Sequence, residues 1–123
     1  MFLTRDEVLE IHRQLIDRFG GKSGVRDVGL LESALFRPKT GYYKDISELS
    51  TALFESLIMN HPFFDGNKRV AFFATDVFLR INRFRFQVKP IEAHTFLIGL
   101  LDSNNCSYEN LLPWVKKSIR SLA

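Results

Sequence analysis

Five side chains that can handle phosphate, protons or metal ions fall within nine consecutive residues. They are His61, Asp65, Asn67, Lys68 and Arg69, in the segment His-Pro-Phe-Phe-Asp-Gly-Asn-Lys-Arg. An ordinary helix–loop–helix connection would also use a proline to end one helix, an Asp-Gly turn, and an asparagine to cap the next helix. Such a connection does not need so many reactive groups at one helix start, so we favour a catalytic site.

The end of this segment has the features of a phosphate-binding cradle. A helix that begins here would direct unpaired backbone N–H groups and a partial positive charge at a ligand. Gly66 would let the backbone approach closely, while Lys68 and Arg69 add full charges where a transferred phosphoryl group gathers negative charge. We therefore predict that Gly66, Asn67, Lys68 and Arg69 bind phosphate.

The start of the segment offers a metal ligand and a base. Asp65 is a hard oxygen ligand beside the cradle, and Mg²⁺ is commonly held by one or two carboxylates together with nucleotide phosphates. An imidazole such as that of His61 can accept a hydroxyl proton near neutral pH. The predicted reaction transfers part of a nucleoside triphosphate to a target, with Asp65 as the Mg²⁺ ligand, His61 as the general base and Phe63 as a core anchor.

Helical periodicity on both sides of the segment indicates which elements position it. Thr4 with Glu7 reads as a capping box, Pro38 and Pro62 as helix stops and Pro90 as a first-turn residue. The predicted elements, in order, are a helix over 4–19, a glycine-rich loop over 20–29, a short helix over 30–37, a turn over 39–44, helices over 45–60 and 67–82, an extended connection over 83–88, a helix over 90–102 and a last helix from Ser107.

Two of these assignments have alternatives. Residues 39–44 could form an extended flap that meets a partner, although we favour the turn. Residues 83–88 alternate like a strand, yet no convincing partner strand is visible, and the last helix is expected to face inward through Leu111, Leu112, Val115 and Ile119. The prediction is an all-α fold over 1–123, a compact single-domain bundle of about six helices. The active-site loop joins a helix ending near Asn60 to a central helix starting near Asn67.

Composition narrows the class of protein. The 123 residues are 46% hydrophobic and include twelve phenylalanines, which is enough for a core without disulfides. The single cysteine, Cys106, the polar start and the lack of a long apolar run favour a soluble cytoplasmic protein that does not bind membranes. The net charge of +3 favours anionic partners. Between positions 68 and 89 one acid, Asp76, opposes six cations: Lys68, Arg69, Arg80, Arg83, Arg85 and Lys89.

The nine-residue segment closely resembles the active-site motif of Fic/Doc proteins, and residues 21–35 resemble the early region of the Doc branch, named for death on curing. The resemblance implies a Fic/Doc-like fold with ATP as co-substrate. It also implies His61 as the base that deprotonates a target hydroxyl, Asp65 as the Mg²⁺ ligand, and an anion hole of Gly66, Asn67 and Arg69.

Two departures from the general Fic pattern indicate which reaction to expect. Lys68 replaces the usual second glycine, and Phe72 stands where a second arginine would follow. Doc-like members carry the same lysine and are similar to kinases in outcome. The resemblance thus implies a toxin that places the γ-phosphate on a threonine of elongation factor Tu and arrests translation. AMP transfer is the second hypothesis, and a non-catalytic helical module that binds peptides is the third.

The resemblance also implies control by a separate antitoxin, whose C-terminal segment binds along a groove of the toxin. The family's inhibitory signature has only a partial match here, at residues 51–56, so inhibition by a second chain is expected rather than self-inhibition. Nucleic acid would be contacted only through the antitoxin, if at all. The basic residues at 80, 83 and 85 could steer the nucleotide or an acidic partner, or could simply suit a helix C-terminus.

Four residues are set aside as structural. His12 and His94 lie on predicted helices with no metal-ligand cluster, so each is interpreted as a surface residue or as a satisfied structural histidine. Trp114 is interpreted as core or interface packing, and Asp27 as a cap or turn former.

Overall fold

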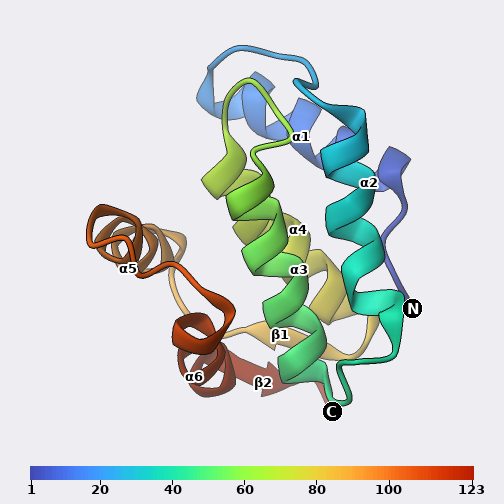
Figure 1. Ribbon diagram of the computed structural model, residues 1–123, viewed down its shortest axis with the longest axis vertical. Helices are drawn as coiled ribbons and strands as arrows, with labels where there is room; N and C mark the ends of the chain where they lie inside the picture. The colour runs from blue at the N-terminus through green and yellow to red at the C-terminus, as the bar shows by residue number, and fades with distance from the viewer.

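Six α-helices and one small sheet make up the computed structural model, which describes residues 1–123 (Figure 1). The elements in order are α1 (Arg5–Phe19), α2 (Val28–Phe36), the 3₁₀ helix η1 (Arg37–Thr40), α3 (Ile46–Asn60), α4 (Asn67–Ile81), β1 (Phe84–Phe86), α5 (Pro90–Asp102), α6 (Tyr108–Ser118) and β2 (Ile119–Ser121). The predicted all-α fold is confirmed.

Polar caps define where most helices begin. Thr4 and Glu7 form both hydrogen bonds of the capping box at the start of α1. The side chains of Asp27, Asp45 and Ser107 each accept the N–H three residues ahead, at the starts of α2, α3 and α6. Because Asp27 is the cap, α2 starts at Val28, two residues earlier than predicted.

Helical structure does not end before Pro38, where the sequence predicted that it would. Pro38 lies inside η1, which continues from α2, and the turn that follows has Gly41 in the left-handed region at φ 86°. Residues 39–40 belong to η1, residue 41 forms a bend and residues 42–44 have no regular secondary structure, so the predicted turn is centred on Gly41.

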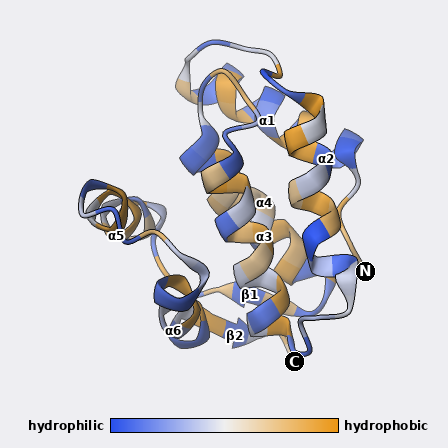
Figure 2. Ribbon diagram, viewed as in Figure 1, coloured by the Kyte–Doolittle hydropathy of each residue, from blue (hydrophilic) through white to orange (hydrophobic).

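The antiparallel pair α3 and α4 forms the centre of the molecule, with α2 and α6 against α3, and α1 against α4. Figure 2 shows hydrophobic segments along α2 and α3 and on α4 behind them. The core is one cluster in which Phe54, Phe63 and Phe78 are the largest fully buried side chains. The loop between α3 and α4 is therefore held at both ends by buried helices.

The prediction for residues 83–88 was wrong in one respect. Phe84–Phe86 forms β1, which pairs antiparallel with β2 and places Phe86 opposite Ile119. Ile119 is buried as predicted, but it lies in this strand rather than in the last helix. Neither strand was recognised as half of a pair because each is only three residues long and the two lie far apart in the sequence.

Helix α5 projects from the rest of the bundle (Figure 1). It packs against α4, and its Phe96 stacks on Trp114 of α6 with ring centroids 4.7 Å apart. None of the helices combines the length and the apolar character needed to cross a membrane.

Candidate active site

His61 lies at the C-terminal end of α3 with a left-handed backbone, φ 48° and ψ 56°. Its side chain is exposed and has no hydrogen-bond partner in the protein, so the imidazole is free to meet a substrate. The next two residues are buried, and Phe63, only 1% exposed, holds the loop in the core as predicted. Buried residues therefore anchor the loop in the core, while the His61 side chain remains accessible to solvent.

The start of α4 is shaped by Gly66 and Asn67. Gly66 is the N-cap residue, with φ 76°, and no side chain caps the helix. The Asn67 amide is committed to the loop itself, since its Oδ1 accepts from the Phe63 N–H and its Nδ2 donates to the Phe63 carbonyl, both at 3.0 Å. Asn67 can therefore offer a phosphate its backbone N–H, and its side chain fixes the turn.

The first three N–H groups of α4 have no acceptor in the protein. They belong to Asn67, Lys68 and Arg69, directly after the glycine cap. A helix N-terminus of this kind is a site for an anion. This is the place at which the sequence predicted the phosphate cradle.

Asp65 is exposed and its carboxylate is oriented by two backbone donors. Its Oδ2 accepts from the Lys22 N–H at 3.1 Å and its Oδ1 from the Gly66 N–H at 2.9 Å. These hydrogen bonds, and then the charge of Arg69, hold the pKa of Asp65 below its ordinary value. The ionised carboxylate keeps free lone pairs, so it fits the predicted role of Mg²⁺ ligand.

The loop before α2 wraps the candidate site and holds it in place. Arg26 donates from Nε to the His61 carbonyl at 2.8 Å and from a terminal nitrogen to the Asn60 carbonyl at 2.9 Å. The Arg26 backbone N–H donates to the Pro62 carbonyl at 2.8 Å, and an isolated bridge pairs Val25 with Phe63. Arg26 was not identified from the sequence as a residue of this region, because the carbonyls it contacts lie far downstream in the chain.

Lys68 and Arg69 line a groove of about 760 Å³ beside the loop. Arg69 lies over the Phe19 ring, 4.3 Å from the guanidinium carbon to the ring centroid, and no carboxylate pairs with either cation. The groove runs between α1, α4 and α5, and its other lining residues are Ile11, Gln14, Leu15, Arg18, Phe19, Phe72, Phe73, Val77, Pro90, Ile91, His94 and Leu97. It is therefore apolar at its walls and cationic at the end near the loop.

The residues set aside at first fall into two groups. Asp27 caps α2 and Trp114 packs on Phe96, as interpreted from the sequence. His94 is exposed on the groove wall, whereas His12 is buried directly beneath the active-site loop. The position of His12 could not be inferred from its own helix, because the group it contacts lies on another element.

The basic residues in the last turn of α4 and just after it do not join the cradle as a group. Arg80 pairs with Asp76 at 2.7 Å, and the second oxygen of that carboxylate accepts from the Phe86 N–H at 2.9 Å. Arg85 makes only a long contact of 3.5 Å to the Phe86 carbonyl. Arg80 is therefore engaged in a local helix pair.

Comparison with known proteins identifies related sequences. The Fic/DOC family model matches residues 2–79, which include α1 to α3, most of α4 and the whole active-site loop. A protein described as "Toxin Doc" from Mycolicibacterium smegmatis is 46% identical over 86 residues. That match covers 66% of this chain and 64% of the mycobacterial protein, so just under two thirds of that relative is spanned.

A second relative is "Protein kinase doc" of Escherichia phage P1. It is 31% identical over 84 residues, which cover 65% of this chain and 67% of the phage protein.

Proposed function

Since this chain belongs to the Fic/Doc family and to its Doc branch, we propose that it is a toxin with protein kinase activity. It transfers the γ-phosphoryl group of ATP to a hydroxyl of a translation protein, for which a threonine of elongation factor Tu is the candidate. The observation that carries this proposal is that one short loop has the unpaired N–H groups of Asn67, Lys68 and Arg69 at its end and the exposed His61 imidazole, which has no partner, at its start.

In the proposed reaction, His61 accepts the proton of the target hydroxyl. The hydroxyl oxygen then forms a bond to the γ-phosphorus while the bond from that phosphorus to the bridging oxygen breaks, and ADP leaves with the bonding electrons. The α4 N–H groups, the Lys68 ammonium and the Arg69 guanidinium stabilise the charge on the phosphoryl oxygens. The products are a phosphorylated target, ADP and a protonated His61.

The proposed cofactor is Mg²⁺, with Asp65 as its protein ligand. Asp65 is the only acidic residue of the loop, and no cluster of three or more metal-ligating side chains exists in the protein. A single carboxylate suits Mg²⁺, which takes most of its ligands from nucleotide phosphates and water. When bound, Mg²⁺ would neutralise charge on the phosphates, while Lys22 and Gly66 keep the carboxylate oriented through their N–H groups.

Phosphoryl transfer is favoured over AMP transfer by two positions on α4. Lys68 is half-buried on the groove wall, where a glycine would leave more space for a nucleotide phosphate. Phe72 is only 7% exposed and stacks on Phe86 with centroids 5.0 Å apart. A core aromatic therefore stands where a second phosphate clamp would be required, and binding must rely on Lys68 and Arg69.

The reaction class can be tested with labelled nucleotide. Purified protein is incubated with elongation factor Tu, Mg²⁺ and ATP that is labelled at either the γ or the α phosphate. We expect label on the target only from γ-labelled ATP, and none with the His61→Ala variant. Label from the α position alone would establish AMP transfer instead. If His61→Ala arrests growth as strongly as wild type, the protein acts as a binding module without catalysis.

We further propose that the groove binds the C-terminal segment of an antitoxin as an amphipathic helix. Apolar walls from three helices suit the apolar face of such a segment. The unpaired cations Arg18, Lys68 and Arg69 suit acidic side chains on its edge. An occupant there would cover the two cations proposed to hold phosphate, which explains how binding could silence the toxin.

The partner site can be tested on α5, away from the reacting groups. Ile91 is 67% exposed and lines the groove. The Ile91→Glu variant should bind the antitoxin peptide at least about tenfold more weakly while it retains transfer activity. Glu109→Lys, an exposed change on α6 outside the groove, is the matched control. Equal affinity of Ile91→Glu and wild type would place the antitoxin elsewhere.

A further inference from the structure

His12 lies directly beneath the active-site loop, although it belongs to α1. Its side chain is 4% exposed, and its ring stacks on Phe63 with centroids 3.9 Å apart and an interplanar angle of 10°. Its Nε2 lies 2.9 Å from the carbonyl oxygen of Asp65. Because a carbonyl oxygen can only accept a hydrogen bond, Nε2 must carry the hydrogen and donate it.

We propose that His12 is a positioning residue of the transfer site, an inference that rests on the function proposed above. The Asp65 carbonyl and the Gly66 N–H belong to one planar peptide unit. When His12 fixes the carbonyl, it also fixes the N–H, which donates to the Asp65 carboxylate at 2.9 Å. The imidazole thus sets the direction of the carboxylate and of the peptide from which α4 starts.

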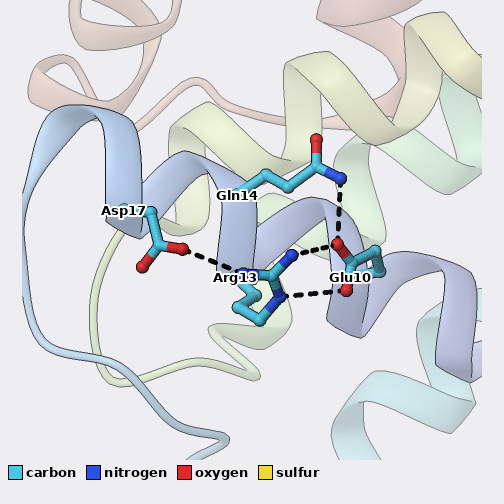
Figure 3. A network of polar contacts seen from close by, with 4 residues as sticks. All are labelled: Glu10, Arg13, Gln14 and Asp17. Carbon is cyan, nitrogen blue, oxygen red and sulfur yellow. Dashed lines mark hydrogen bonds and ion pairs between the residues drawn. The ribbon is translucent and has the colours of Figure 1, made fainter.

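The turn at Gly66 lies near a second residue of α1 as well. A Cβ atom added to Gly66 would lie 3.8 Å from His12 Nε2 and 3.6 Å from the Cδ1 of Ile16, one turn further along α1. A side chain at this position would therefore be in ordinary van der Waals contact with α1. On the solvent face of the same helix, Arg13 bonds to Glu10 and Asp17 (Figure 3). The two faces of α1 therefore have separate tasks.

The competing interpretation is a core histidine that matters only for stability. Two variants separate its two contacts. His12→Phe keeps a buried ring against Phe63 but has no N–H to donate, whereas His12→Gln loses the ring and can place an amide N–H near the Nε2 position. Val115→Ala, which leaves a cavity under the buried face of α6, is the control for a general loss of stability.

The first measurement requires no catalysis. Amide hydrogen exchange is followed by NMR in the protein without nucleotide, at Lys22 and Gly66, whose N–H groups donate to the Asp65 carboxylate. We expect exchange at these two amides to be at least about tenfold faster in His12→Phe than in wild type, and close to the wild-type rate in His12→Gln. In Val115→Ala, exchange at these amides should increase no more than the loss of global stability accounts for. Long-range ¹H–¹⁵N spectra should show the His12 tautomer protonated at Nε2. Unchanged exchange in His12→Phe, or the other tautomer, would overturn the proposal.

The second measurement is steady-state transfer from γ-labelled ATP. His12→Phe should lower kcat about tenfold with little change in the KM for the protein target, and His12→Gln should recover part of the loss. Equal kcat values for His12→Phe and wild type would also overturn the proposal. If wild type itself transfers no label, the proposed function fails, while the exchange rates still decide the positioning role. Should His12→Phe not fold, His12→Asn replaces it, since asparagine is too short to reach the carbonyl.

Discussion

His61 occupies a left-handed backbone conformation, φ 48° and ψ 56°, which residues with a Cβ atom rarely adopt. Arg26 holds the carbonyls of His61 and Asn60, and Pro62 that follows is buried. The surrounding contacts therefore impose the conformation, and the result is an imidazole at the surface with no partner. Local strain and the proposed chemistry coincide at one residue.

Replacing His61 with glycine should separate these two properties. His61→Gly removes the base, so we expect transfer to fall at least about a hundredfold. The free energy of unfolding should equal that of wild type or rise by up to about 1 kcal/mol, because glycine adopts the left-handed region without steric cost. Urea unfolding and γ-phosphoryl transfer are the two measurements. An inactive variant that is clearly less stable would mean that the imidazole also supports the fold.

Arg26 should matter through its two carbonyl contacts rather than through its charge. Arg26→Ala removes both hydrogen bonds and should lower the free energy of unfolding by about 1 to 2 kcal/mol and transfer about tenfold. Arg26→Lys retains the charge without the planar fork, so its activity should lie nearer to alanine than to wild type. Arg13→Lys, in an exposed ion pair on α1, serves as control. Full activity of Arg26→Lys would show that charge alone suffices.

The sequence allowed the polar residues of the loop to be predicted, since their types and spacing lie within one short segment. It did not predict that the Asn67 side chain would bond to the Phe63 backbone instead of facing a ligand. It also could not identify Arg26 and His12 as supports, because each acts on a backbone carbonyl more than thirty positions away. Every residue has a backbone carbonyl, so the residue types along the sequence do not show which carbonyl will accept such a hydrogen bond.

Among the elements, the short strand β1 places one residue deep in the core. Phe86 is 4% exposed and lies close to Phe54 of α3, Phe72 of α4 and Trp114 of α6. One strand residue therefore joins three helices. Its neighbour Phe72 lies on α4, one turn beyond the cations proposed to bind phosphate.

Phe86→Ala should accordingly be costly. We expect a loss of about 3 to 5 kcal/mol in the free energy of unfolding, because a large buried ring is removed from a packed cluster. Urea denaturation followed by circular dichroism measures it. Gln87→Ala, the exposed neighbour, should change stability by less than about 0.5 kcal/mol. Similar losses for the two variants would mean that the strand, not the ring, carries the effect.

Tyr108, the first residue of α6, has a phenol whose titration can be followed. Burial, and then the nearby carboxylate of Glu48, raise the pKa of Tyr108 to about 12. The folded state thus favours the neutral phenol. This contribution to stability is complete below the unfolded-state value of about 10 and is lost as pH rises through the folded-state value.

Ultraviolet titration of the phenolate checks this expectation. One of the three tyrosines, Tyr108, should ionise only near pH 12, and this titration step should be absent in Tyr108→Phe. The stability of wild type, but less so that of Tyr108→Phe, should fall between about pH 10 and pH 12. Ionisation of Tyr108 near pH 10 would contradict the raised pKa of its phenol.

The helix bounds were predictable where local chemistry sets them. The capping box places the start of α1, and Pro90 places the start of α5, both within one residue of the prediction. The pairing of β1 with β2 was not predictable, because three-residue strands are defined by a partner and not by their own pattern. The end of α6 was misplaced for the same reason.

At the scale of the whole molecule, no group of three or more His, Cys, Asp or Glu side chains is placed to hold a metal ion. The protein has one cysteine, which is free, and one continuous hydrophobic core. The only proposed metal is the one that accompanies the nucleotide. Folding and cofactor binding should therefore respond to different treatments.

Removal of divalent metal makes that separation visible. EDTA should abolish transfer and leave the Tm of the nucleotide-free protein unchanged. Saturation with ATP and Mg²⁺, at about 100 times the Kd, should stabilise the fold by about 2.7 kcal/mol, and EDTA should reverse the gain. Differential scanning fluorimetry records both effects. A lower Tm on adding EDTA to the nucleotide-free protein would reveal a structural metal.

The projecting position of α5 has an evolutionary consequence. This helix supplies one wall of the groove, whereas the reacting groups lie on the loop between α3 and α4, braced by α1. If the groove is the antitoxin site proposed above, mutations on the exposed face of α5 alter which peptide fits without moving His61 or Asp65. After gene duplication, substitutions in this one helix could therefore give each copy its own inhibitor. Neither inhibitor would then bind the other copy, and both copies would keep the same chemistry.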